Sequence, residues 1–111
     1  MVAPAAAPPP AVLSTSAGQV PLAISAWCLR GRCGAPIGAA HRVAFARLGE
    51  TVHVLLGFVP RTAKVEVGGI RMKTAVSGRE LSWTVRRGGG VAVRVTSTGG
   101  FVAYVGRLRL R

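Results

Sequence analysis

The feature that most constrains this chain is an alternation of apolar and polar residues with a period of two, which runs from residue 19 almost to the end. The clearest stretch is residues 51–59, where Val52, Val54, Leu56 and Phe58 occupy every second position. This period is typical of half-buried strands, and no window shows the i, i+3, i+4, i+7 spacing of an amphipathic helix. The chain is therefore predicted to be all-β. Glycine or proline breaks the alternation at Gly49-Glu50, Pro60-Arg61, Gly68-Gly69, Ser77-Gly78, Gly88-Gly89-Gly90 and Gly99-Gly100.

Seven or eight strands are expected between these breaks. Clean alternation indicates antiparallel sheets with one face toward water, so an antiparallel β-sandwich is predicted, with a small β-barrel as the alternative. Trp83 lies mid-strand and is expected at the centre of the core. Tyr104 is expected to face inward, where its hydroxyl needs a backbone partner. The other positions expected to face inward include Val20, Leu22, Ile24, Ala26, Cys28, Ile70, Val93, Val95 and Leu108.

The chain length of 111 residues fits one domain. Residues 1–18 are rich in Pro and Ala, and we expect them to form a disordered linker that precedes a sandwich domain over 19–111. This segment lacks the basic start and the unbroken apolar run of a secretory signal. We interpret it as a linker that follows a removed signal or anchor.

The charge balance is strongly basic. The chain has fifteen Lys and Arg residues and three Glu residues, which gives a net charge of +12. Half of all residues are nevertheless apolar. A folded domain with a cationic exterior is therefore expected, because disordered chains are lean in apolar residues. No stretch approaches the ~18 apolar residues of a membrane span. The chain has no Asp, which excludes EF-hand loops and Asp-based catalytic triads.

Seven basic residues fall on outward strand positions or turns in the second half of the chain. If their strands share a sheet, they form a broad cationic face that attracts anionic polymers. Single-strand nucleic-acid readers also need exposed aromatic residues, and Trp27 is the one aromatic residue expected outside the core. The candidate polyanion-binding residues are Arg71, Lys73, Arg86, Arg87, Arg94, Arg107 and Arg109.

The two cysteines, Cys28 and Cys33, lie five residues apart. In an exported protein they would form a disulfide, and in the cytosol they would be reduced thiols. A metal site built from these cysteines and His41 would lack the usual paired ligand spacing, so no metal or cofactor is expected.

The sequence contains residues that could be combined into a hypothetical catalytic triad. Ser82, His53 and Glu66 could be written as a nucleophile, a base and an orienting acid. No local sequence shapes a nucleophile turn around Ser82, and His53 is expected to be a solvent-exposed strand residue. No enzymatic activity is predicted.

Two stretches carry a resemblance to a known class of domain. TVHVLLGFVPRTAKVEVGG (51–69) resembles the mid-strand pairs of immunoglobulin-like and fibronectin-type sandwiches, and GGFVAYVGRLRL (99–110) resembles their closing strand. With the Pro/Ala leader and the Arg-rich composition of a GC-rich genome, the chain resembles a small extracytoplasmic sandwich of an actinobacterial envelope protein. The resemblance implies no functional residues.

Two functions remain open at this point. The first is a non-catalytic extracytoplasmic binding or spacer module, secreted or in the cell envelope, with a cationic face for anionic envelope polymers or an acidic protein partner. The alternative is an intracellular nucleic-acid-binding barrel, which reduced cysteines and an exposed aromatic residue on the arginine face would favour. The specific partner and the oligomeric state do not follow from the sequence.

Overall fold

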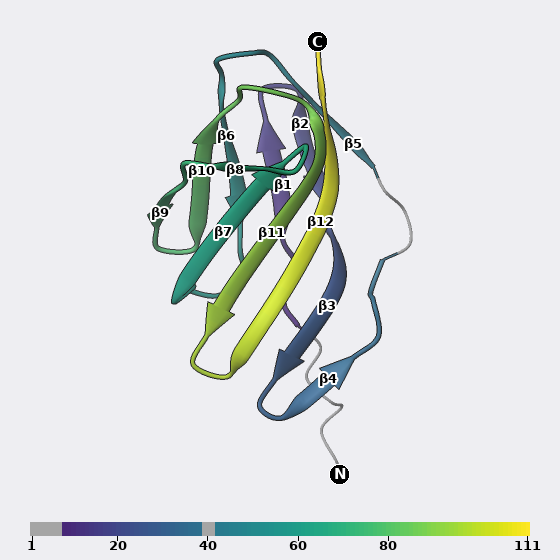
Figure 1. The fold of residues 1–111 in the computed structure, drawn as a ribbon, viewed down its shortest axis with the longest axis vertical. Coiled ribbons are helices and arrows are strands. Elements are labelled where there is room, and N and C mark those ends of the chain that lie inside the picture. Colours follow the sequence, from purple (N-terminus) through teal and green to yellow (C-terminus); the bar gives the residue numbers. More distant parts are fainter. Residues whose placement is uncertain (1–7, 39–41) are drawn as a thin grey trace.

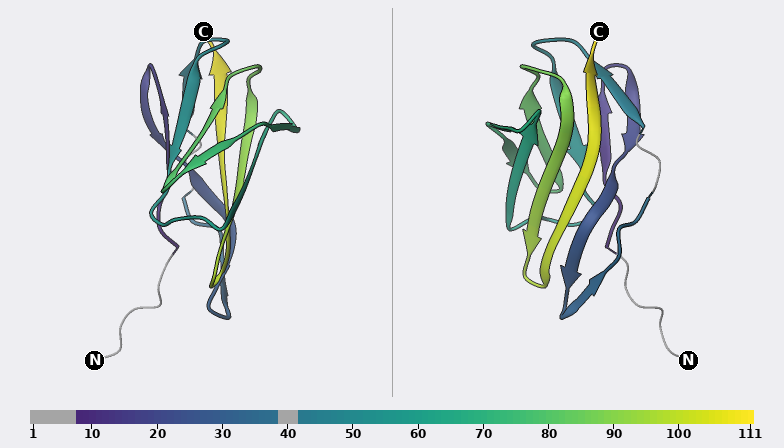
Figure 2. Two further views of the ribbon diagram at one scale, coloured as in Figure 1. Left: turned by 90° about the vertical axis from the view of Figure 1, so that its left-hand side faces the viewer. Right: turned by 45° about the vertical axis from the view of Figure 1, so that its right-hand side comes forward.

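The computed structural model describes residues 8–38 and 42–111, and the described residues form an all-β fold with no helix (Figure 1). They contain twelve strands in two facing sheets, which Figure 2 shows edge-on in its left view. The predicted all-β class and the β-sandwich are confirmed. The strands are β1 (Val12–Thr15), β2 (Gly18–Pro21), β3 (Ala23–Leu29), β4 (Arg32–Gly34), β5 (Val43–Ala46), β6 (Thr51–Leu55), β7 (Thr62–Val67), β8 (Ile70–Met72), β9 (Ala75–Ser77), β10 (Glu80–Thr84), β11 (Gly89–Ser97) and β12 (Gly100–Leu110).

The first sheet has the order β2-β1-β6-β10-β9, and the second has the order β4-β3-β12-β11-β7-β8. All pairings are antiparallel except that of β5, which lies parallel to the last residues of β12. In immunoglobulin-like sandwiches one sheet contains strands A, B, E and D and the other contains C, F and G. Here β6, β10 and β9 take the places of B, E and D, while β7, β11 and β12 take those of C, F and G. The connectivity after residue 42 is therefore immunoglobulin-like.

The core lies between the sheets and is built from every second residue of the long strands. Trp83 is 3% exposed and Tyr104 is fully buried, as predicted. The Tyr104 hydroxyl donates a hydrogen bond of 2.7 Å to the Pro9 carbonyl oxygen, which supplies the expected backbone partner. The buried aliphatic residues around these two rings are Leu13, Val52, Val54, Val65, Val67, Leu81, Val85, Val91, Val93, Val95, Val102 and Leu108.

The predicted boundary at residue 19 is wrong for the part of the leader that the structure describes. Residues 12–15 form β1, which pairs with β6 and with β2. Ala11 and Leu13 are buried in the core. The apolar run Ala11-Val12-Leu13 covers an edge of β6 that would otherwise be open, and this burial orders the segment. Residues 1–7 of the predicted linker lie outside the described residues.

The predicted facing of the first strand fails at a bulge. Tyr104 pairs with Ile24 and Ala103 pairs with Ala26, so Ser25 is an extra residue opposite β12. The bulge reverses the alternation. Ile24 therefore faces the core as predicted, but Trp27 faces the core in place of Ala26 and Cys28, and it packs against the core cluster. The prediction that Trp27 is the exposed aromatic residue is wrong for this reason.

The structure has four more strands than the eight expected segments, and all four are short. β1, β2, β4 and β9 contain three or four residues each, too few for an alternation to be recognised. Ile70 also departs from its predicted inward position and is 45% exposed, because β8 is an edge strand. No helix among the described residues is long and apolar enough to cross a membrane.

Candidate functional site

The structure divides the seven candidate polyanion-binding residues between two regions. All seven are exposed. Arg71 and Arg94 lie on the outer face of the larger sheet, and Lys73 lies in the connection from β8 to β9. The other four, which are Arg86, Arg87, Arg107 and Arg109, lie at the end of the sandwich where β12 finishes. The predicted single face is therefore two separate groups.

On the sheet face, Arg94 is the central cation. It lies directly opposite Lys64 on β7 and Ala103 on β12. Its guanidinium carbon is 4.3 Å from the centroid of the Phe101 ring, a cation–π contact with a diagonal neighbour. Arg71 lies opposite Glu66, but no ion pair forms between them within the described residues.

The second group is larger than predicted, because two further arginines join it. β5 runs parallel to β12, with Phe45 opposite Arg109, so the β5–β6 turn carries Arg47 to the same end. The backbone N–H of Arg111 donates to the Ala46 carbonyl oxygen at 3.0 Å. We call this region the arginine end and define it as Arg47, Arg86, Arg87, Arg107, Arg109 and Arg111, all of which are exposed.

Backbone contacts hold the loops of the arginine end together. Val85, next to Arg86, exchanges two hydrogen bonds of 2.8 Å with the β5–β6 turn, from Gly49 N–H and to the Glu50 carbonyl. On the other side, Gly88 packs so closely on β12 that a Cβ atom there would lie 2.8 Å from the Leu108 carbonyl oxygen. The loops that carry these arginines are therefore fixed to one another by backbone contacts.

Of the three glutamates, only Glu50 lies at this end. It accepts hydrogen bonds from the backbone N–H groups of Arg47 and Ser16 and from the Ser16 hydroxyl. The backbone hydrogen bond from Arg47, followed by those from Ser16 and by the charge of Arg111, lowers the pKa of Glu50 below its ordinary value. Glu50 is thus ionised at neutral pH and bonded to the turns, and it is the one glutamate near the six guanidinium groups.

A shallow hollow of about 250 Å³ lies between two of these arginines. Its walls are Arg107 to Leu110 on one side and the glycines Gly88 and Gly89 on the other.

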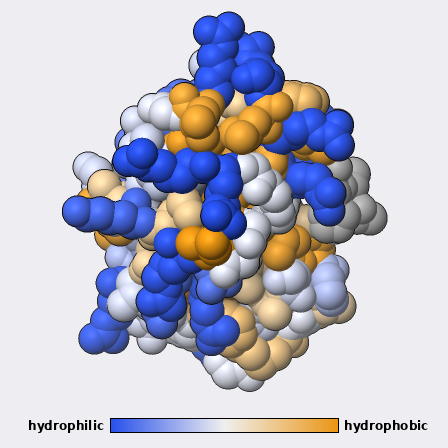
Figure 3. Space-filling model, turned by 45° about the horizontal axis from the view of Figure 1, so that its top comes forward, coloured by the Kyte–Doolittle hydropathy of each residue, from blue (hydrophilic) through white to orange (hydrophobic). Residues whose placement is uncertain are grey.

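Large apolar side chains are also exposed at the arginine end. Leu48, in the β5–β6 turn, is 66% exposed, and Phe45 and Leu110 are 41% and 42% exposed. Figure 3, which brings this end of the molecule forward, shows hydrophobic patches separated by protruding hydrophilic side chains. This end is therefore amphipathic as well as cationic.

Sequence reasoning missed Arg47 and Arg111 as members of the site. Arg111 continues the alternation of Arg107 and Arg109, so its pattern could have identified it. Arg47 carried no such signal, because its position depends on the parallel pairing of β5 with β12.

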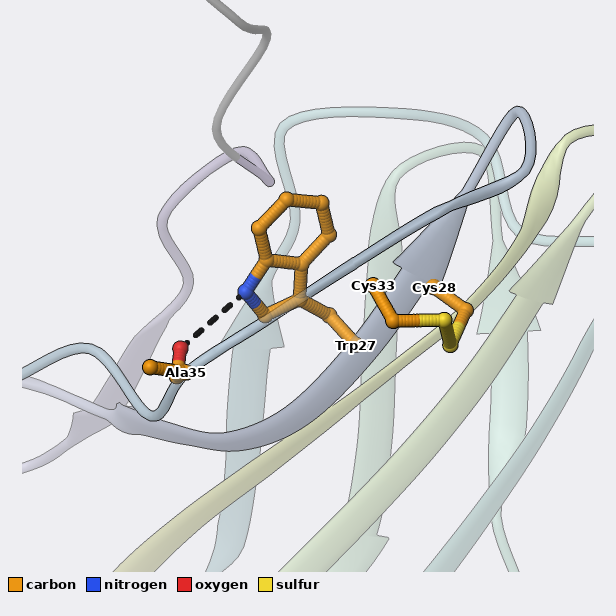
Figure 4. Close-up of a disulfide and its surroundings, with 4 residues drawn as sticks. All are labelled: Trp27, Cys28, Cys33 and Ala35. Atoms are coloured by element: carbon orange, nitrogen blue, oxygen red, sulfur yellow. Dashed lines mark hydrogen bonds between the residues drawn. A yellow bond between two sulfur atoms is a disulfide. The ribbon is translucent and has the colours of Figure 1, made fainter.

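At the opposite end, a disulfide joins Cys28 and Cys33 across the β3–β4 hairpin (Figure 4). The two residues face each other directly, so the predicted pairing agrees with the structure. The neighbouring Trp27 ring lies over Gly34, and its Nε1–H donates to the Ala35 carbonyl at 3.2 Å. Bonded sulfur atoms are not the thiolates that bind metals. His41, the third ligand of that hypothesis, lies outside the described residues.

The structure does not assemble the hypothetical triad of Ser82, His53 and Glu66. Ser82 and His53 are cross-strand neighbours on the smaller sheet, but Glu66 lies on β7 of the other sheet. His53 Nδ1 lies 3.4 Å from Glu80 Oε1 instead. Within the described residues no hydrogen bond joins Ser82 to His53.

No protein-family model, no curated protein and no solved structure matches this chain.

Proposed function

We propose that the chain is a non-catalytic binding or spacer module of the cell envelope or extracellular space, and that its arginine end binds an anionic envelope polymer or an acidic protein partner. The observation that carries this proposal is the charge of that end. Six exposed guanidinium groups have one glutamate among them, and its carboxylate is already bonded to backbone N–H groups. Such a concentration of one charge attracts polyanions and speeds their encounter.

The disulfide supports a site of action outside the cytoplasm. Disulfides persist in oxidising compartments and are rare in cytosolic proteins. Cys28 and Cys33 are the only cysteines of the chain, and they are paired with each other. An oxidised pair also argues against the intracellular nucleic-acid-binding alternative.

The test compares two triple variants that each lose three positive charges. The first is Arg86→Gln, Arg107→Gln, Arg109→Gln at the arginine end. The matched control is Arg32→Gln, Arg61→Gln, Arg79→Gln, three exposed arginines at the opposite end, of which Arg32 begins β4 and the other two lie in turns. Affinity for heparin, polyphosphate and duplex DNA is measured at two salt concentrations.

We expect the first variant to bind all three polymers more weakly, with a shallower salt dependence. For duplex DNA the slope falls by about 0.9 for each arginine that contacts a phosphate. The control variant should bind almost as the original chain does. Equal losses in both variants would show that net charge alone governs binding, and would contradict the proposal. A tight, salt-insensitive preference for DNA would favour the nucleic-acid alternative.

A further inference from the structure

The arginine end combines two properties that a purely polyanion-binding surface does not need together. Turns are usually built from small or polar residues, yet Leu48 stands 66% exposed in the β5–β6 turn between Arg47 and Gly49. Phe45 on β5 and Leu110 on β12 are also exposed, and Phe45 lies directly opposite Arg109. Three large apolar side chains therefore project among six guanidinium groups.

A dissolved polyanion leaves these apolar groups in water and gives no reason for their position. A second copy of the chain does not fit either, because each copy carries a net charge of +12 and the two arginine ends would repel each other. A surface that is anionic outside and apolar a few ångströms below would satisfy both kinds of side chain.

We infer that the arginine end docks onto the surface of a bilayer that contains anionic phospholipids. This inference rests on the proposed function and names the partner of that same site. Peripheral proteins bind such surfaces by burying apolar side chains at the headgroup boundary while basic residues contact the headgroups. Arginine suits this position, since its stem packs on apolar surface and its guanidinium stays with the phosphates.

The hollow between Arg107 and Arg109 supplies a place for one headgroup. Arg107 and Arg109 both line it, together with Gly88 and Gly89, so two cationic side chains are available to a phosphate there. Phe45 lies directly opposite Arg109 on β5. A lipid whose phosphate occupies the hollow would thus have an aromatic side chain next to it, toward the acyl chains.

The experiment measures binding of the whole chain to vesicles by co-sedimentation. One set contains phosphatidylglycerol and phosphatidylcholine in equal parts, and the other contains phosphatidylcholine alone. Heparin binding is measured in parallel, because heparin is a polyanion that offers no apolar interior for Leu48 to enter. The variants are Leu48→Ser and its matched control Val59→Ser, which removes a side chain of similar exposure (63%) at the opposite end.

We expect the chain to bind the anionic vesicles and not the neutral ones. Leu48→Ser should weaken vesicle binding about tenfold, which corresponds to about 1.4 kcal/mol, and should leave heparin binding unchanged. Val59→Ser should change neither. Because Leu48 is exposed, its replacement should not unfold the domain, and unchanged heparin binding verifies this.

The possible failures are distinguishable. If the chain binds heparin but no anionic vesicle, or if Leu48→Ser binds vesicles like the original chain, the bilayer inference is overturned and the proposed function stands. If neither heparin nor anionic vesicles are bound, both fail. Duplex DNA bound more tightly than vesicles under the same conditions would overturn the inference in favour of a nucleic-acid ligand.

Discussion

At the scale of single residues, Tyr104 and Trp83 differ in whether the polar atom of the buried ring has a hydrogen-bond partner. Both rings are buried between the sheets, but the Tyr104 hydroxyl donates to Pro9, whereas the Trp83 indole N–H has no hydrogen-bond partner among the described residues. The hydroxyl therefore ties the start of the described chain to its last strand. The Trp83 ring stabilises the core through its apolar area alone.

Burial raises the pKa of Tyr104 to about 12. The ordinary value, which holds in the unfolded chain, is about 10. Because the folded pKa is the higher one, the stability linked to the neutral phenol is complete below pH about 10 and is lost as pH rises through about 12. Tyr104 is the only tyrosine, so its phenolate absorbance can be followed directly. We expect it to develop near pH 12 in the native protein and near pH 10 in denaturant. Coincident titrations would contradict the burial of the hydroxyl.

Two substitutions at Trp83 separate its apolar area from its polar atom. Trp83→Ala should lower the free energy of unfolding by about 3–5 kcal/mol, because it leaves a large cavity in the core. Trp83→Phe keeps most of the apolar ring and removes the unpartnered N–H group, so we expect a clearly smaller loss. Urea denaturation measures both. A midpoint that Trp83→Ala does not shift would show that the ring is exposed.

At the scale of elements, three features constrain the β3–β4 hairpin: its turn, its disulfide and the packing of Trp27. Arg30 and Gly31 both have positive φ, as the two central residues of a type I′ turn require. The disulfide bonds its strands, and the Trp27 ring covers Gly34. A Cβ atom at Gly34 would lie 2.0 Å from the Trp27 ring, so no larger residue fits unless the indole moves.

Gly34→Ala should therefore destabilise the domain by displacing the indole from the core and from the Ala35 carbonyl. Gly90→Ala is the matched control, since Gly90 is also a strand residue but a Cβ atom there would contact nothing within 4 Å. Thermal unfolding of the two variants is compared. If both have the same melting temperature, the indole does not pack on Gly34 as the structure places it.

Reduction of the disulfide tests how much the Cys28–Cys33 bond contributes to the stability of the domain. The closed loop is short, and on the loop-entropy estimate its contribution is about 2 kcal/mol. We expect native exported protein to contain no free thiol, and expect reduction to lower the free energy of unfolding by about that amount. Two titratable thiols in native exported material would remove the main support for a site outside the cytoplasm.

At the scale of the whole molecule, the net charge of +12 lowers the stability of the folded state through repulsion between like charges. Among the described residues no arginine side chain lies at salt-bridge distance from a Glu side chain, since the one contact of that kind is His53 with Glu80, and the arginines therefore repel one another. Screening by salt reduces this repulsion. The melting temperature should therefore rise as sodium chloride is added from low ionic strength. A melting temperature that falls with added salt would contradict self-repulsion as the dominant electrostatic effect.

The all-β class, the core positions of Trp83 and Tyr104, the disulfide partners and the exposure of the arginines could all be predicted from the sequence. These properties follow from period-two alternation and from the count of charges and cysteines, which are local or additive quantities. Three other features depend on how the strands pair: Ala11 and Leu13 belong to the core, the bulge at Ser25 reverses the facing of Trp27, and Arg47 lies with Arg109 and Leu48 at one end. Each of these depends on which strand lies beside which, because a bulge, an edge or a parallel pairing is a relation between distant segments and leaves no periodic mark in either one.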